Sequence, residues 1–266
     1  MKLFLQILVA VLLVSLSLEI DTYEKKINSL DAEAKCLDGS SPALLVHQGS
    51  EKDKILIYLM GERTCDVQGN SINAALDECV RRTKTTEGSS KYWEAQTAAD
   101  GLGILETDPA LNKFASWTKI IIPHCDGSLF QGNNKDVVKH KGTDLYFRGS
   151  VNMRANFKWI DLNYKLNDAT KIVLAGSLIG GIATMIWIDE LRAMVTQPEK
   201  VYGIIDSGIA PKPPIPQVMA RNAEMMSQKL GIPNALPPMQ PTPPKVTTID
   251  PTPVKPSKRK GTFKNT

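Results

Sequence analysis

A strand, a glycine-flanked turn and a helix follow one another in Lys171–Met185, KIVLAGSLIGGIATM. Lys171–Ala175 is a short, apolar, β-branched run that predicts a buried strand, and Ile182–Leu191 has the apolar spacing of a helix. This order is the frame of a nucleophile elbow, whose pattern G-x-S-x-G places an attacking serine on a sharp turn. The chemistry that such a frame supports is acyl transfer.

The glycines of this stretch set the register of the pattern. Gly176 and Gly180 match its two glycines, and Gly181 follows. The nucleophile position is therefore Leu178, whose side chain cannot attack a carbonyl carbon. Ser177 lies one residue earlier. Because consecutive side chains of a sharp turn point in different directions, we expect its hydroxyl to be satisfied by local backbone rather than to attack.

The length and charge of the chain favour one globular domain without a nucleic-acid partner. A chain of 266 residues can form one α/β domain with a buried core. The net charge is only +4, and basic residues crowd the last dozen positions. We therefore expect no nucleic acid to bind, and we interpret the basic end as a solvated segment.

Residues 1–17 have the features of a secretory signal peptide. Lys2 is positive, Leu3–Val14 is apolar, and Ser15 and Ser17 are small residues before a cleavage point. The apolar run is shorter than the roughly 20 residues that a membrane span prefers. We expect cleavage after Ser17, secretion, and no membrane span in the mature chain.

Four cysteines, Cys36, Cys65, Cys79 and Cys125, would be oxidised in the secretory pathway. None forms a C-x-x-C pair, and we expect neither a metal site nor a cofactor. Four cysteines allow three pairings, and the sequence alone does not choose among them. One hypothesis pairs Cys65 with Cys79 across a short loop, which leaves Cys36 and Cys125 to tie the N-terminal arm to a central strand.

Strand-like and helix-like segments alternate up to about residue 210. The predicted strands are Ala43–Val46, Ile55–Met60, Trp117–Pro123, Lys171–Ala175 and Val201–Asp206. The predicted helices are Asp21–Glu33 (a weak pattern), Ile72–Thr83, Tyr92–Ala99, Asn152–Leu166 and Ile182–Leu191. Gln48–Lys54 resembles a hairpin connection. The alternation predicts a three-layer α/β domain over 18–210 with a mostly parallel sheet.

The composition changes at Pro211, because thirteen of the seventeen prolines lie between Pro211 and Pro256. Met219–Leu230 is one candidate helix in this region, and from Pro233 almost nothing apolar remains. We expect 211–266 to be a disordered, extended tail.

The order and spacing of several motifs resemble the pectin acetylesterase family, which includes the Notum carboxylesterases. The motifs are AKCLDGSSPA at Ala34–Ala43, ILIYLMGERTC at Ile55–Cys65, IIIPHCDGSLF at Ile120–Phe130, the elbow AGSLIGG, and KVYGIIDSG at Lys200–Gly208. The resemblance implies a secreted α/β-hydrolase fold, incomplete here in its C-terminal third. It also implies removal of acetyl groups from pectin or of a palmitoleoyl group from a signalling protein.

The resemblance further implies a serine nucleophile, a histidine base, an aspartate and an oxyanion hole. This sequence departs from each part. Leu178 occupies the nucleophile position, and Gly61 alone remains of the family's glycine run in the oxyanion region. The family's aspartate and histidine follow the elbow, whereas His47, His124 and His140 all precede it.

Three polar residues are candidates for lining the site rather than for catalysis. His124 stands where the family usually has Tyr, at the end of a central strand, and we interpret it as a hydrogen-bonded structural histidine; Asp126 follows closely. Asp206 ends a parallel strand at the edge where ligands bind in such sheets.

The elbow leads to an expectation about strain. Its central residue has a backbone conformation that costs a non-glycine residue about 1–3 kcal/mol. Without chemistry to maintain this strain, we expect either a relaxed turn at Leu178 or a Leu178 side chain that fills the former cleft.

Three functions are consistent with these features. The first is an inactive family member retained to bind a glycan or acyl ligand, and the second is an esterase with a rearranged site built from Ser177 with His124 or His140. The third is an interaction protein that acts through the proline-rich tail. An uncovered sheet edge, left by the shortened C-terminal third, is a further candidate site for a protein partner.

Overall fold

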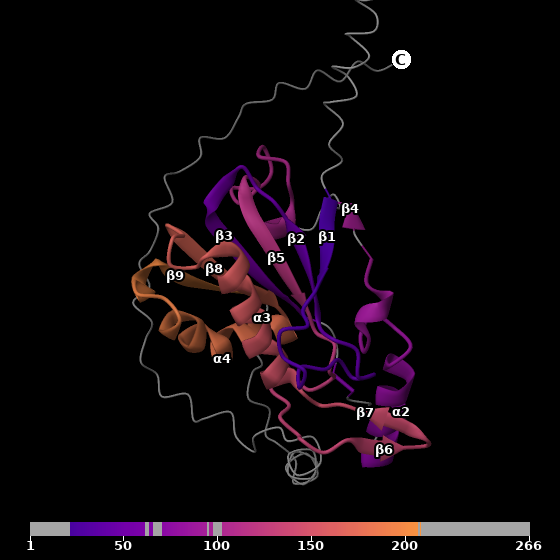
Figure 1. Ribbon diagram of the computed structural model, residues 1–266. Helices are drawn as coiled ribbons and strands as arrows, with labels where there is room; N and C mark the ends of the chain where they lie inside the picture. Colours follow the sequence, from indigo (N-terminus) through magenta and orange to yellow (C-terminus); the bar gives the residue numbers. More distant parts are fainter. Residues whose placement is uncertain are drawn as a thin grey trace, which may run out of the picture. The chain divides into compact units, whose positions relative to one another are not determined.

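The structure is a computed structural model that describes residues 22–61, 64–65, 71–94, 96–97, 103–206 and 208 (Figure 1). The predicted signal peptide at 1–17 and the predicted tail at 211–266 lie outside the described residues, as does the candidate helix Met219–Leu230. The domain boundaries therefore remain predictions. No helix in the described ranges is long and apolar enough to cross a membrane.

The described strands are β1 (Thr22–Ile27), β2 (Ala43–His47), β3 (Glu51–Met60), β4 (Gln96–Thr97), β5 (Trp117–Pro123), β6 (Val138–His140), β7 (Thr143–Leu145), β8 (Lys171–Ser177) and β9 (Val201–Asp206). The helices are α2 (Ile72–Arg82), α3 (Gly149–Tyr164) and α4 (Ile179–Ala193), with short 3-10 turns η1 (Ser90–Tyr92), η2 (Gly103–Leu105) and η3 (Pro198–Lys200). The five predicted strands and three of the predicted helices are confirmed, with ends shifted by a few residues at most.

The main sheet has the strand order β4-β1-β2-β5-β3-β8-β9. The strands β5, β3, β8 and β9 run parallel, whereas β2 pairs antiparallel with both β1 and β5. The predicted α/β fold with a mostly parallel sheet is thus confirmed. The predicted hairpin around Gln48–Lys54 is wrong, because β5 inserts between β2 and β3.

The weak helical pattern of Asp21–Glu33 is also overturned, because Thr22–Ile27 forms β1. Tyr23 is buried, and its hydroxyl donates a 2.8 Å hydrogen bond to the carbonyl of Leu105. Pairing with β2 and burial of this aromatic ring outweigh a weak local preference.

The helix predicted at Tyr92–Ala99 is wrong where the structure describes it. Tyr92 ends the 3-10 turn η1, and Gln96–Thr97 forms the short strand β4, which pairs with β1. A side chain interaction anchors the start of this segment, since the indole of Trp93 donates a 2.8 Å hydrogen bond to the carbonyl of Thr86.

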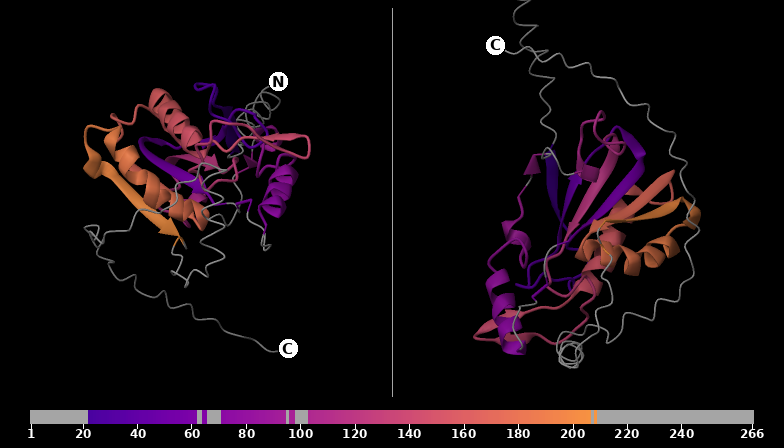
Figure 2. Two further views of the ribbon diagram at one scale, coloured as in Figure 1. Left: turned by 90° about the horizontal axis from the view of Figure 1, so that it is seen from below. Right: turned by 180° about the vertical axis from the view of Figure 1, so that it is seen from behind.

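Alternate residues of the sheet face two separate cores. On one face α3 and α4 cover the central strands, and Phe157 and Trp187 from these helices meet edge to face. On the other face the cover comes from the segment between η1 and β5, including Trp93 and Leu105. In the described residues the two long helices therefore lie on one side of the sheet (Figures 1 and 2).

A smaller cluster lies beyond the ends of β3 and β5. The helix α2 packs there beside the β6–β7 hairpin, as both the front and the rear views show (Figures 1 and 2). Leu37, Leu76 and Phe147 form its apolar centre. Two disulfides, Cys36–Cys125 and Cys65–Cys79, tie this region together.

Candidate active site

The elbow is present at the junction of β8 and α4. Leu178 has φ 50° and ψ −114°, a region of backbone space that is strained for a residue with a side chain. Its side chain is 60% exposed. Both alternatives expected from the sequence are therefore wrong, because the turn has not relaxed and Leu178 does not fill a buried cleft.

The glycines around the turn allow backbone segments to approach one another closely. A Cβ atom on Gly180 would lie 2.0 Å from the carbonyl oxygen of Leu59, and one on Gly61 would lie 1.9 Å from that of Ser177. Gly176 and Gly181 are similarly crowded by backbone. The structure thus places Gly61, from the end of β3, directly against the elbow. Only residues without a side chain fit at these contacts.

Ser177 takes part in a hydrogen bond that the sequence did not indicate. The hydroxyl of Tyr58 in β3 donates to the Ser177 hydroxyl oxygen over 2.8 Å, so a neighbouring strand rather than local backbone satisfies this group. Ser177 follows Val173 and Ala175 in the alternation of β8, on the same face as Tyr58. Its side chain therefore belongs to the sheet face and not to the apex of the turn.

Asp206 lies beside the elbow at the end of β9. It pairs in register with Ser177, and its carbonyl oxygen accepts a 3.0 Å hydrogen bond from the backbone N–H of Leu178. The residue is exposed. Asp206 and Leu178 thus meet at the carboxyl edge of the sheet, where ligands bind in folds of this class.

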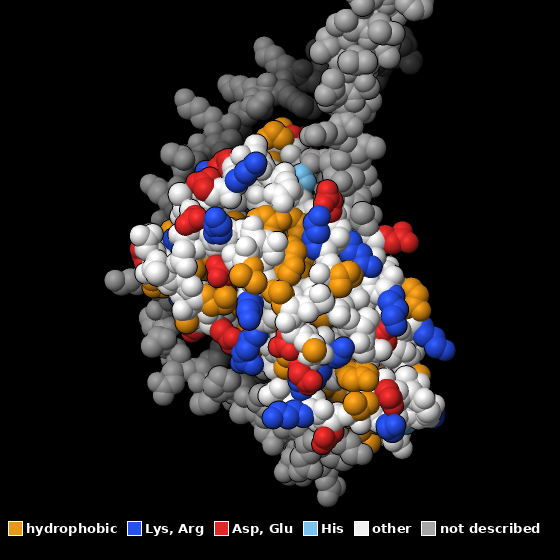
Figure 3. Space-filling model, in the orientation of Figure 1, with side chains coloured by type: hydrophobic (Ala, Val, Ile, Leu, Met, Phe, Trp, Pro, Cys, Tyr) orange, Lys and Arg blue, Asp and Glu red, His pale blue; other side chains and the backbone are white. Residues whose placement is uncertain are grey.

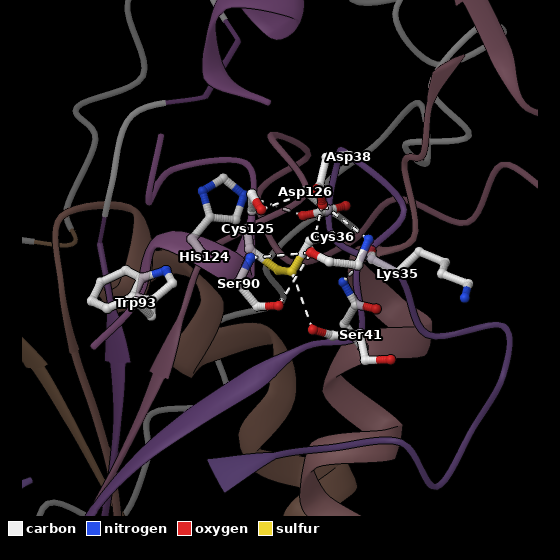
Figure 4. Close-up of a disulfide and its surroundings, with 12 residues drawn as sticks. Lys35, Cys36, Asp38, Ser41, Ser90, Trp93, His124, Cys125 and Asp126 are labelled. Carbon is white, nitrogen blue, oxygen red and sulfur yellow. Dashed lines mark hydrogen bonds and ion pairs between the residues drawn. A yellow bond between two sulfur atoms is a disulfide. The ribbon is translucent and has the colours of Figure 1, made fainter. Parts of the chain in front are cut away.

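His124 and Asp126 are brought together but are buried. Their side chains are 0% and 2% exposed, and the Nε2 atom of His124 lies 3.3 Å from Oδ1 of Asp126 (Figure 4). This contact is not an aligned hydrogen bond, since neither ring nitrogen has a hydrogen-bond partner among the described residues. The expected hydrogen-bonded histidine is therefore replaced by a ring that packs on Phe130, with centroids 4.8 Å apart.

The carboxylate of Asp126 is engaged locally. It accepts hydrogen bonds from the backbone N–H and the hydroxyl of Ser128. As placed here, neither His124 nor Asp126 offers surface to a ligand, so contact with one would require neighbouring side chains to move. Their proposed role in lining the site stays a prediction.

The two disulfides follow the pairing hypothesis. Cys36–Cys125 joins the loop before β2 to the end of β5, with Cα atoms 4.9 Å apart (Figure 4). Cys65–Cys79 joins the segment after β3 to α2. The backbone N–H of Leu37 also donates to the carbonyl of Cys125 over 2.7 Å, so the first disulfide lies directly beside His124 and Asp126.

A cavity that sequence reasoning did not indicate lies near α2 and the β6–β7 hairpin. Its volume is about 620 Å³. The lining residues are Asp38, Thr83, Lys91, Tyr92, Lys139, Gly142, Thr143 and Asp144. Burial acts to raise the pKa of Asp38, but hydrogen bonds from Ser40, Ser89 and Lys91 outweigh it and lower that pKa. These bonds saturate the carboxylate, which identifies Asp38 as a structural anchor.

The described surface does not concentrate one sign of charge on the face shown in Figure 3, where acidic and basic side chains alternate with apolar ones. In the described ranges no group of three or more His, Cys, Asp or Glu residues could hold a metal ion. The elbow itself combines a strained turn, an apolar residue at its apex (Leu178) and an adjacent carboxylate (Asp206).

Retained strain at Leu178 leads to a first prediction. The variant Leu178→Gly should be more stable than Leu178→Ala by about 1 kcal/mol, because glycine removes a strain of about 1–3 kcal/mol at some cost in unfolded-state entropy. At an ordinary helical position glycine is less stable than alanine by a similar amount. Urea unfolding of both variants measures the difference, and an alanine variant as stable as the glycine variant would show that the turn carries no strain.

These features define a class, the α/β-hydrolase-like folds with a nucleophile elbow. A family model described as Pectinacetylesterase matches residues 20–218. The chain belongs to the pectinacetylesterase family.

Relatives with curated names support this membership. Pectin acetylesterase 5 of Arabidopsis thaliana is 33% identical over 193 residues, which cover 71% of this chain and 42% of the relative. A palmitoleoyl-protein carboxylesterase NOTUM of Schmidtea mediterranea is 28% identical over 180 residues, which cover 65% of this chain and 32% of that relative. The chain thus spans about two-fifths of the pectin acetylesterases that it matches and about a third of this NOTUM.

A solved structure gives the same fold. The Wnt deacylase Notum from Drosophila superposes with a TM-score of 0.64 at 18% identity, over 80% of this chain and 62% of that one. At this identity the likeness establishes the fold alone.

Proposed function

We propose that this chain is a secreted, catalytically inactive member of its family, retained to bind a ligand rather than to hydrolyse one. The observation that carries the proposal is Leu178 at the apex of an otherwise intact elbow. An alkyl side chain there can neither attack an ester nor be activated by a base. The close glycine contacts around the turn support a frame that is kept while its residue at the apex has changed.

Secretion is supported by two features. Residues 1–17 read as a signal peptide, and all four cysteines form disulfides, which persist in oxidising compartments. A reducing environment would remove the covalent ties of α2 and of the loop before β2.

The alternative of a rearranged esterase requires a histidine within hydrogen-bond distance of the Ser177 hydroxyl, to act as its base. His124 is buried beside Asp126, and Nε2 of His140 lies 2.7 Å from Oδ1 of Asp77 in α2. The hydroxyl of Ser177 accepts its hydrogen bond from Tyr58 instead. This geometry favours the inactive reading over the rearranged one.

The exposed leucine suggests which ligand chemistry the elbow suits. The names of the relatives refer to acetyl and palmitoleoyl esters. An acyl chain laid over the elbow would cover Leu178, and burying a leucine side chain fully contributes about 1.5–3 kcal/mol. We therefore place an acyl group at Leu178, with Asp206 close to any polar part of the ligand. A glycan without an acyl group, and a partner of the tail, are the competing ligands.

The first test is hydrolysis of a short-chain aryl acetate by the purified protein. We expect no turnover above buffer for the wild type, for Ser177→Ala or for Leu178→Ser, since the last variant restores a hydroxyl but no histidine beside it. Turnover that Ser177→Ala abolishes would establish an esterase with a shifted nucleophile and reject the proposal.

The second test measures binding by the wild type and by a further variant, Leu178→Asp. A fluorescent palmitoleoylated peptide should bind the wild type and should bind Leu178→Asp at least tenfold more weakly, because a carboxylate cannot be covered by an acyl chain without losing its hydration. The peptide without its acyl group and an acetylated pectin fragment serve as controls. Equal binding of the acylated and acyl-free peptides would contradict an acyl site at the elbow.

A further inference from the structure

The described residues leave one half of a sheet face incompletely covered. On the side opposite α4, β3 presents Tyr58 and Met60 and β9 presents Tyr202 and Ile204; Tyr202 is 49% exposed and the other three are partly buried, whereas Val173 and Ala175 of β8 between them are buried. The neighbouring half of this face is closed by Trp93 and its surroundings. We name these four residues, Tyr58, Met60, Tyr202 and Ile204, the open face.

The orientation of the open face follows from the alternation of β9. A Cβ atom on Gly203 would lie 2.7 Å from Cδ1 of Ile188 in α4, so Gly203 points toward that helix. Tyr202 and Ile204 therefore point to the opposite side. Tyr202 is 49% exposed on that side, and β9 is the last strand in the order of the described sheet, so its outer edge has no described strand beside it either.

The chain itself contains a segment suited to this surface. After Gly208, residues Gln217–Leu230 read QVMARNAEMMSQKL. At 100° per residue, Met219, Ala223, Met226 and Leu230 fall within a stripe of about 60° on one side of a helix. Arg221, Glu224 and Gln228 fall on the opposite side.

The borders of this segment also carry helix signals. Pro216 lies directly before it, next to the first helical position that proline favours, and Gly231 follows Leu230 with Pro233 two residues later. A helix over Gln217–Leu230 would be about 21 Å long. Eight residues lie between Gly208 and its start at Gln217, a reach of roughly 30 Å when extended.

We propose that Gln217–Leu230 forms an amphipathic helix that packs its Met219–Leu230 stripe on the open face. Three neighbouring strands about 4.8 Å apart present a surface about as wide as one helix. Methionine side chains adapt to an irregular surface such as one that combines two tyrosines with Met60 and Ile204. The helix completes a layer opposite α4, and it covers Tyr58, the residue that donates to Ser177 beneath the elbow.

Hydrogen exchange of the full chain tests this packing. In Met226→Asp, amide exchange in β9 should accelerate at least tenfold, because a charge in the stripe would detach the helix and release the last strand. The matched variant Gln228→Asp places the same charge on the opposite side of the helix, and β9 should exchange as in the wild type. Equal acceleration in both variants, or in neither, would overturn the proposal.

A double-mutant cycle keeps the test decisive if the aspartate variant does not fold. Tyr202→Ala and Met226→Ala should each weaken stability in urea unfolding, and their combined effect should be smaller than the sum of the two because both remove one contact. Strict additivity would reject the contact. Light scattering distinguishes another occupant, since a dimer that Tyr202→Ala dissociates and Met226→Ala leaves intact would assign the open face to a second copy instead.

Discussion

Replacing Cys36 and Cys125 together by alanine is expected to lower the free energy of unfolding by about 4 kcal/mol. The two cysteines are 89 residues apart in the sequence, and a crosslink that closes so long a loop removes much of the entropy of the unfolded chain. Without the disulfide, the loop before β2 would be held at this point by the hydrogen bond from the Leu37 N–H to the carbonyl oxygen of Cys125, beside the buried His124. Urea unfolding under non-reducing conditions measures the change.

The second disulfide supplies the matched control. Cys65 and Cys79 are only 14 residues apart, so their double alanine variant should lose about 3 kcal/mol, roughly 1–2 kcal/mol less than the first pair. An equal or larger loss at Cys65 and Cys79 would mean that native packing around α2, rather than loop length, governs the contribution of these bonds.

Gly180→Ala is expected to lower the free energy of unfolding by about 3 kcal/mol. The added Cβ would lie 2.0 Å from the carbonyl oxygen of Leu59 and near the backbone nitrogen of Gly61, and backbone cannot yield as a flexible side chain can. Inserting a methyl group into close-packed structure typically costs 1–3 kcal/mol, and a backbone contact places this site at the upper end. Unfolding of the variant gives the value.

Gly142→Ala separates crowding from backbone conformation. Gly142 has a φ of 76° but no atom within 4 Å of an added Cβ. The variant should therefore lower the free energy of unfolding by the conformational cost alone, about 1–2 kcal/mol. If Gly142→Ala were as harmful as Gly180→Ala, close approach at the elbow would not be the reason for its glycines.

These two predictions bear on why the elbow keeps its strained turn with Leu178 at the apex. The turn at Leu178 is embedded in contacts between β3, β8 and α4 that Gly61 and Gly180 make possible. Its backbone is also held by the bond from the Leu178 N–H to the carbonyl of Asp206. A large cost at Gly180 would mean that the backbone around the elbow is part of the folding core, so that a leucine at the apex need not relax the turn.

Much of this protein could be predicted from sequence because the relevant signals are local. The strands Trp117–Pro123 and Val201–Asp206 are found with the bounds that their apolar runs and turn residues indicate. The spacing of the elbow glycines places Leu178 at the apex without any structure. The short separation of Cys65 and Cys79 indicated one pairing hypothesis, which the structure bears out.

Other features depend on partners that are distant in sequence. Thr22–Ile27 became a strand because β2 pairs with it and Tyr23 is buried, and β5 entered the sheet between two strands that are neighbours in the chain. Ser177 meets Tyr58, 119 residues away, and His124 is enclosed rather than placed in a cleft. The strain at Leu178 survives for the same reason, since surrounding backbone contacts, and not the residue's own preference, determine its φ and ψ.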